Sequence, residues 1–141
     1  MKKLLFPLAE VITPNIPEGE VLSGIKIQSE SDMERAAKEI GDSCGCAVLL
    51  KGGHSINDAN DLLYHNGTFT WFTGKRIDNP NTHGTGCALS SALATLLPSS
   101  TDIPMAAREA KRYITQAIIH ADELQIGKGH GPVHHFYAQW Y

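Results

Sequence analysis

Residues Asn81–Ala94 have the sequence NTHGTGCALSSALA, and this stretch decides how the chain is interpreted. Gly84 and Gly86 precede a run of small and apolar residues that predicts a helix over about 86–97. Glycines ahead of a helix let backbone N–H groups point at one centre, where the helix dipole favours an anion. The stretch is neither a Walker A loop nor G-x-G-x-x-G, because Leu89 occupies the third glycine position. The pattern alone leaves an anion hole and a tight strand-to-helix connection both open.

Cys87 lies where this helix is expected to begin. The positive end of the helix dipole favours a thiolate in the first turn of a helix. Such a thiolate takes a proton from a substrate hydroxyl or acts as a nucleophile. The alternative is a buried small residue that packs the helix against a sheet. The residue type alone does not decide between the two.

The composition is that of an ordinary globular protein. The 141 residues are 42% hydrophobic and 19% charged, and their number predicts a single domain over residues 1–141. A net charge of -3 gives no basic footprint for nucleic acid, and no window approaches the ~20 apolar residues of a membrane span. The first residues resemble a signal peptide, but Pro7 and Glu10 interrupt the apolar run. We therefore expect a cytoplasmic protein that contacts neither nucleic acid nor membrane.

Predicted strands and helices alternate along the chain. The apolar runs predict strands at 10–13 and 46–51 and a hairpin over 61–72 with Asn66-Gly67 at its turn. Capping patterns and helical spacing predict helices over about 15–24, 31–41, 86–97 and 104–124. This alternation is typical of an α/β fold. We expect a mostly parallel sheet with helices on both faces and one hairpin.

Polar loops follow both predicted strands and precede Cys87. In parallel sheets ligands bind at the carboxyl ends of strands, so these loops are candidate sites. Glu18 either completes a capping box with Asn15 or holds a hydrated magnesium ion, which needs few carboxylates. Lys51, before two glycines, is either a solvated loop lysine or a phosphate ligand.

Two further groups of residues have plain interpretations. The three cysteines do not suggest a disulfide framework, and Cys44 and Cys46 fit small residues that enter a strand better than a metal site. His130, His134 and His135 lack the H-E-x-x-H pattern and a nearby cysteine or carboxylate. We expect them in a C-terminal loop and edge segment rather than in a zinc site.

Four motifs occur in order: VITPNIPEGEVLSG (Val11–Gly24), VLLKGGH (Val48–His54), NTHGTGCALSSALA (Asn81–Ala94) and GKGHGPVHHF (Gly127–Phe136). Together they closely resemble the C-terminal half of hydroxymethylpyrimidine/phosphomethylpyrimidine kinases, thiamine-pathway members of the ribokinase-like superfamily. The resemblance covers about Leu4 to Tyr141. A cysteine in THGTGC is typical of this branch, whereas the wider superfamily usually has aspartate there.

The resemblance implies a ribokinase-like three-layer fold, here incomplete, and transfer of the γ-phosphoryl group of ATP, with Mg²⁺, to the pyrimidine and then to its monophosphate. Cys87 matches the catalytic base, and Gly84, Thr85 and Gly86 match the anion hole. The resemblance also implies that Asn15, Lys51 and Thr82 bind phosphate or nucleotide and that Glu18 organises magnesium.

Members of the resembled family carry a similar length of chain before the point at which this sequence begins. That half supplies several strands and most of the pyrimidine pocket. The sequence therefore suggests a fragment, a split gene product or a truncated form that pairs with a complementing half. An uncovered strand edge also predicts self-association, as a dimer or larger species. The alternatives are a non-catalytic nucleotide- or phosphate-binding module and a related pyridoxal or sugar kinase.

Overall fold

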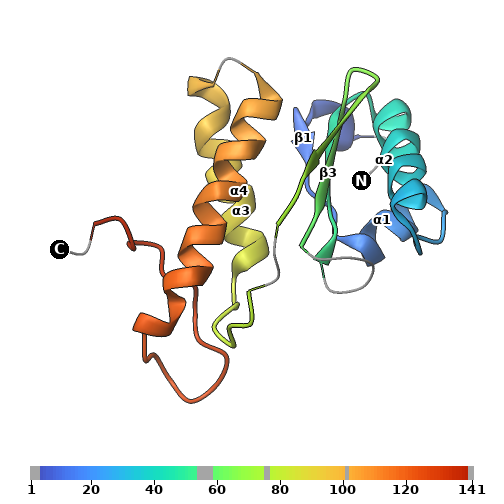
Figure 1. The fold of residues 1–141 in the computed structure, drawn as a ribbon. Helices are drawn as coiled ribbons and strands as arrows, with labels where there is room; N and C mark the ends of the chain where they lie inside the picture. The colour runs from blue at the N-terminus through green and yellow to red at the C-terminus, as the bar shows by residue number, and fades with distance from the viewer. Residues whose placement is uncertain (1–3, 54–58, 75–76, 101, 140–141) are drawn as a thin grey trace. The chain divides into compact units, whose positions relative to one another are not determined.

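A computed structural model describes residues 4–53, 59–74, 77–100 and 102–139 of the chain. The chain forms two compact units, Met1–Lys75 and Arg76–Tyr141. The first holds a sheet with two helices, and the second holds a pair of long helices (Figure 1). The prediction of a single domain over the whole chain stays a prediction.

The first unit contains a four-stranded sheet in the order β1 (Val11–Ile12), β2 (Ala47–Lys51), β3 (Asp61–His65), β4 (Thr68–Phe72). β1 pairs with β2 in parallel, whereas β2–β3 and β3–β4 are antiparallel pairs. The expectation of a mostly parallel sheet is therefore wrong for these strands. A parallel crossover needs a dozen or more residues, and only residues 52–60 join β2 to β3. The predicted hairpin is confirmed, with positive φ at Asn66 and Gly67 in its turn.

Two helices, α1 (Ile16–Ser23) and α2 (Glu30–Cys44), cover one face of this sheet. Ile16 of α1, Met33 and Ile40 of α2, and Val48 and Leu50 of β2 belong to one buried cluster. Burial of these side chains, at about 1.5–3 kcal/mol each, joins the two helices to the sheet. The predicted helices on the opposite face stay a prediction.

The boundaries of α2 differ from those expected from sequence. Ser29 rather than Ser31 caps the helix, because its Oγ accepts a hydrogen bond from the Asp32 N–H. Gly41 does not end the helix, which continues to Cys44 and is capped by Gly45 with φ 69°. Residue 41 is a glycine, although it lies inside the helix, because the Tyr64 ring occupies the space that a side chain would need.

The second unit is built on α3 (Thr85–Leu96) and α4 (Ile103–Ile119), which pack against each other. Short 3-10 turns, η3 (Leu97–Ser99) and η4 (His120–Glu123), extend the two helices. Both predicted helices are therefore confirmed. The second changes from α-helix to the 3-10 turn η4 over its last residues. Small and apolar residues at helical spacing are buried along α4 and η4: Ala107, Ala110, Ile114, Ala117 and, in η4, Ala121.

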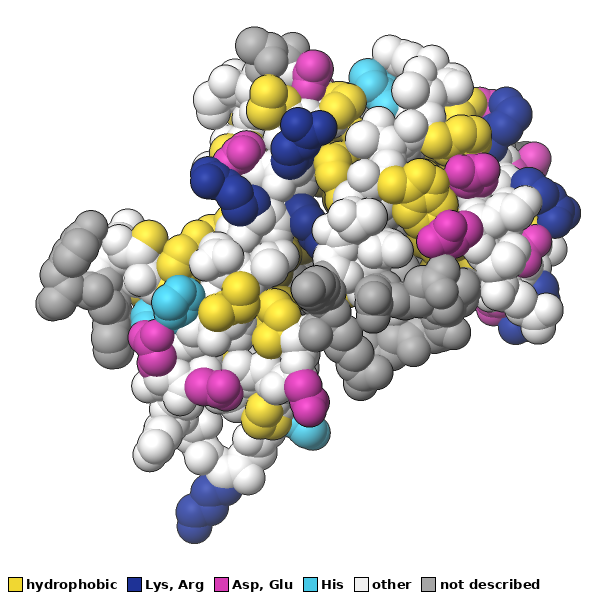
Figure 2. Space-filling model, in the orientation of Figure 1, with side chains coloured by type: hydrophobic (Ala, Val, Ile, Leu, Met, Phe, Trp, Pro, Cys, Tyr) yellow, Lys and Arg dark blue, Asp and Glu magenta, His cyan; other side chains and the backbone are white. Residues whose placement is uncertain are grey.

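Acidic and basic side chains are interspersed over the face drawn in Figure 2. This distribution agrees with the small net charge of -3. Within the described ranges, the helices are all too short or too polar to cross a membrane.

Candidate functional site

The loops after β1 and β2 lie side by side in the first unit. Asn15 and Lys51 form a parallel bridge that lies beyond the paired residues of β1 and β2. The Lys51 N–H donates to the Pro14 carbonyl at 2.9 Å. The carboxyl ends of the two parallel strands therefore bring Asn15, Glu18 and Lys51 to one edge of the sheet. This is the arrangement that ligand binding at an α/β sheet requires.

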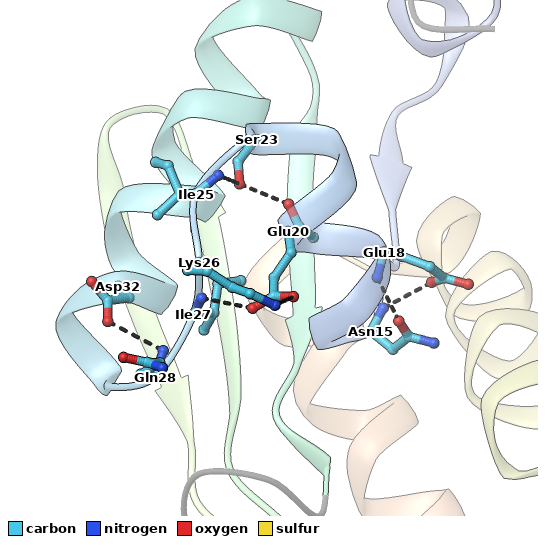
Figure 3. A network of polar contacts seen from close by, with 10 residues as sticks. Asn15, Glu18, Glu20, Ser23, Ile25, Lys26, Ile27, Gln28 and Asp32 are labelled. Atoms are coloured by element: carbon cyan, nitrogen blue, oxygen red, sulfur yellow. Dashed lines mark hydrogen bonds and ion pairs between the residues drawn. The ribbon is translucent and has the colours of Figure 1, made fainter.

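Asn15 caps α1 and Glu18 lies in its first turn, and each side chain is bonded to the backbone of the other residue (Figure 3). Asn15 Oδ1 accepts from the Glu18 N–H at 2.8 Å, and Glu18 Oε2 accepts from the Asn15 N–H at 2.9 Å. The predicted capping box is thus confirmed. Both residues are exposed, and one carboxylate suits magnesium, which usually takes one or two carboxylates together with phosphates and water. Glu18 is therefore compatible with both of its interpretations.

The glycine loop after β2 is held by residues that sequence reasoning missed. Asp61 is buried, and its Oδ1 accepts from the Gly52 N–H at 3.0 Å. A side chain on Gly52 would collide with the Asn60 carbonyl oxygen, so the loop requires glycine there. The only signal in the sequence is an aspartate at the start of an otherwise apolar strand. His54, which was expected in the same loop, lies outside the described residues.

The second unit carries the glycine-rich turn that precedes Cys87. Gly84 caps α3 with φ 83°, and Thr85, Gly86 and Cys87 form the first turn of the helix. The first N–H groups of a helix have no partner within it, so this turn offers N–H donors to an anion. The Thr85 N–H also donates to the Thr82 carbonyl, at 3.3 Å. Thr82 is exposed, and its carbonyl accepts from the Thr85 hydroxyl at 2.7 Å. The predicted anion-hole residues and Thr82 therefore lie together.

Cys87 is exposed and lines a cavity of about 720 Å³. The alternative of a buried packing residue is wrong for Cys87. The interpretation as a packing residue fits Cys44, which is buried. Burial raises the pKa of the half-buried Cys46 thiol. Cys87 thus has the exposure that a reactive cysteine needs.

The cavity is lined by one face of α3, by α4 and by the C-terminal segment. Small residues form its α3 wall: Gly84, Ala88, Ser91, Ala92 and Thr95. On the opposite wall Arg112 pairs with Glu109 at 2.6 Å, and the Tyr113 hydroxyl donates to the His135 carbonyl at 3.2 Å. Burial raises the pKa of Tyr113. Nothing in the local sequence marks these wall residues, because they approach Cys87 only through the packing of α3 on α4.

The C-terminal histidines support the expectation of a loop and edge segment. His83 and Pro132 form a bridge, and His130 Nδ1 lies 3.2 Å from the Pro80 carbonyl oxygen. His134 is buried, with 1% of its surface exposed. Among the residues that the structure describes, no group of three or more His, Cys, Asp and Glu is placed to hold a metal.

The candidate residues therefore form two sets. Asn15, Glu18 and Lys51 lie together in the first unit, and Thr82 lies with Gly84–Cys87 in the second. A family model described as phosphomethylpyrimidine kinase matches residues 1–134. The chain belongs to the phosphomethylpyrimidine kinase family.

Curated relatives agree with this family. The chain is 47% identical to the thiamine biosynthesis bifunctional protein ThiED of Geobacter sulfurreducens, over 98% of the chain and 28% of that protein. It is 40% identical to the hydroxymethylpyrimidine/phosphomethylpyrimidine kinase of Haemophilus influenzae, over 96% of the chain and 52% of that kinase. The chain thus spans about half the length of such single-function relatives. The resemblance noted from the four motifs is confirmed.

Solved structures confirm the predicted ribokinase-like α/β fold. The pyridoxal kinase from Staphylococcus aureus in complex with ADP matches with a TM-score of 0.90 and 32% identity, over 99% of this chain and 52% of that one. A phosphomethylpyrimidine kinase from Clostridium difficile matches with a TM-score of 0.67 and 40% identity, over 81% of this chain and 45% of that one. Members of the phosphomethylpyrimidine kinase family thus share their fold with pyridoxal kinases.

Proposed function

We propose that the chain carries the anion-hole and nucleotide-binding half of an ATP-dependent kinase that phosphorylates hydroxymethylpyrimidine and its monophosphate in thiamine biosynthesis. The observation that carries this proposal is the turn Gly84–Cys87, which combines first-turn N–H donors with an exposed thiol at a cavity. Phosphoryl transfer depends mainly on positioning and on stabilisation of charge, which such a turn supplies.

The proposed chemistry assigns one role to each set of residues. Cys87, as thiolate, removes the proton from the acceptor hydroxyl, whose oxygen then attacks the γ-phosphorus of ATP. The bond from that phosphorus to the β,γ-bridging oxygen breaks and leaves ADP. The N–H groups of Gly84, Thr85 and Gly86 stabilise the charge on the transferred group.

The loops of the first unit hold the nucleotide in this proposal. Lys51 and Asn15, which their bridge places side by side, bind phosphate oxygens in the first unit. Thr82 is the proposed phosphate-binding residue of the second unit. Glu18 is the carboxylate that would hold magnesium, whose charge would neutralise that of the phosphates. The capping box fixes Glu18 at the first turn of α1 and so determines where that carboxylate lies.

Calorimetry with ATP and Mg²⁺ tests the nucleotide-binding part of the proposal. We expect binding that requires Mg²⁺ and that weakens when Lys51 is replaced by Met. Absence of ATP binding under all conditions would overturn the proposal. Binding without phosphoryl transfer in any context would favour the second candidate, a non-catalytic nucleotide-binding module.

A third candidate is a pyridoxal kinase, because the S. aureus pyridoxal kinase matches with a TM-score of 0.90. The cysteine at position 87 supports the pyrimidine kinase branch instead. A panel of hydroxymethylpyrimidine, its phosphate and pyridoxal discriminates between them, and preferential turnover of pyridoxal would overturn the pyrimidine assignment.

We also propose that the first unit associates with a second copy or with a complementing half. Its edge strand β1 is only two residues long, and Leu8 and Val21 are 82% and 80% exposed. Exposed apolar side chains and an open strand edge favour association. Light scattering should give a species larger than a monomer, and a monodisperse monomer would contradict self-association.

A further inference from the structure

Two loops of the second unit are joined through the side chain of Asn81. One is the turn that leads into α3, and the other is the glycine-rich segment after η4. Asn81 Nδ2 donates to the Ala121 carbonyl at 2.9 Å and to the Leu124 carbonyl at 3.3 Å. Its Oδ1 accepts from the Gly131 N–H at 3.0 Å. The amide therefore uses both its donor and its acceptor capacity across about forty to fifty residues of sequence.

Neighbouring contacts reinforce the same junction. The Asn81 N–H donates to Asn79 Oδ1 at 2.8 Å, and Asn79 Nδ2 donates to the Ile118 carbonyl at 2.9 Å. The His83 N–H donates to the Gly131 carbonyl at 3.2 Å. Gly131 is thus bonded through both its N–H and its carbonyl to the segment that precedes Gly84.

The packing at Gly131 is as specific as its hydrogen bonds. A β-carbon there would lie 2.5 Å from Asn81 Oδ1 and 2.8 Å from Asn81 Cγ. The Asn81 amide cannot move aside without loss of its bonds to Ala121 and Leu124. Gly129, two residues earlier in the same loop, has nothing within 4 Å of such a β-carbon. Only one of these two glycines is therefore required by the Asn81 contact.

We propose that Asn81 is a positioning residue, whose amide fixes the turn at 81–87 so that the N–H groups at its end are preorganised for an anion. Gly84, three residues further on, has φ 83° and starts the helix, and a glycine-rich turn needs outside contacts to keep one conformation. Donors that are preorganised in this way stabilise a developing charge without reorganisation. This inference rests on the proposed function, because it assigns the anion to that site.

Hydrogen exchange and calorimetry on the whole chain test the proposal together. In Asn81→Ala, amide exchange at Thr85 and Ala88, whose N–H groups donate to the Thr82 and Gly84 carbonyls, should accelerate about tenfold or more, because the turn loses the contacts that hold it. Exchange over α2 and the middle of α4 should stay within about twofold of the wild type. The Kd for ATP with Mg²⁺ should rise about tenfold, at a temperature where circular dichroism shows both proteins folded.

Asn81→Asp is a second variant that keeps the acceptor for Gly131 and loses the donors to Ala121 and Leu124. It should accelerate exchange at Thr85 and Ala88 as well, because a carboxylate then faces two carbonyl oxygens. Gly131→Ala should reproduce the effect of Asn81→Ala, and the double variant should be no worse than either single one. Gly129→Ala is the matched control and should match the wild type.

Three results would overturn the proposal: unchanged exchange at Thr85 and Ala88 in Asn81→Ala, equal acceleration throughout α4, or equal effects of the two glycine substitutions. The exchange measurement needs no nucleotide. If the wild type does not bind ATP, the proposed function fails while the exchange data still decide the role of Asn81.

Discussion

Asn15 and Glu18 each accept a hydrogen bond from the other's backbone, at 2.8 and 2.9 Å, and so close the first turn of α1. Asn15→Ala removes the cap, which should lower the free energy of unfolding by about 1 kcal/mol. Urea denaturation measures the change. Asn15→Ser should retain most of the stability because serine also caps helices. Equal losses in the two variants would show that capping is not the reason.

Glu18→Gln separates the structural role of this residue from its proposed role at magnesium. Glutamine at the same position also completes a capping box, so the free energy of unfolding should change little. Loss of the negative charge should raise the Mg²⁺ concentration needed for ATP binding by about tenfold or more. The reason is that loss of even an outer-shell partner lowers metal affinity by such a factor. Calorimetry at several Mg²⁺ concentrations measures this. An unchanged Mg²⁺ dependence would remove Glu18 from the proposed site.

Gly41→Ala should destabilise the protein, although alanine is a better helix former. A β-carbon on Gly41 would lie 2.6 Å from the Tyr64 ring, and the Tyr64 hydroxyl donates to Asp42 Oδ1 at 2.6 Å. Overpacking typically costs about 1–3 kcal/mol, against about 1 kcal/mol gained in helix propensity. Denaturant unfolding measures the balance, with Glu39→Ala on the exposed side of α2 as control. A gain in stability would show that Tyr64 moves freely.

The carboxylate of Glu20 should make the free energy of unfolding depend on pH in the acid range. The Ile27 N–H, at 2.9 Å, and then Lys26 lower the pKa of Glu20 below its ordinary value of 4.5. A lowered folded-state pKa contributes stability above about pH 4.5, and that contribution is lost as the pH falls through the folded value. Glu20→Gln should therefore flatten the decline in the unfolding midpoint below that pH.

Lys26→Ala is the control for this effect. The backbone N–H of Ile27 is the larger cause of the lowered pKa, so this variant should keep most of the acid dependence. Loss of all acid dependence in Lys26→Ala would assign the effect to the ion pair instead. Unfolding midpoints measured between pH 3 and 6 distinguish the two.

Features set by neighbouring residues could be predicted from the sequence. The Asn66-Gly67 hairpin, the Asn15–Glu18 capping box and the helix start at Gly84 each depend on residues within four positions of one another. The glycine turn before α3 followed from these local patterns, and its role as an anion hole stays a prediction.

Features set by distant contacts could not be predicted in this way. Gly41 has the sequence signature of a helix end, but the ring of Tyr64 explains why a glycine lies inside α2. Asp61 is marked only by its position at the start of a strand, and Asn81 has no local signature, because their partners Gly52 and Gly131 are brought close only by folding. The antiparallel pairing of β2 with β3 follows from the short connection over residues 52–60, not from the sequences of the two strands.

The most direct test of the account is phosphoryl transfer by a chimeric enzyme in which residues 4–139 replace the matching stretch of the H. influenzae kinase. The readout is ADP formation with ATP, Mg²⁺ and hydroxymethylpyrimidine phosphate, compared between the chimera and its Cys87→Ala variant. We predict turnover by the chimera and a kcat about 10²-fold or more lower in the variant, with the KM for ATP little changed. A folded chimera without turnover, or a variant with undiminished kcat, would contradict the account.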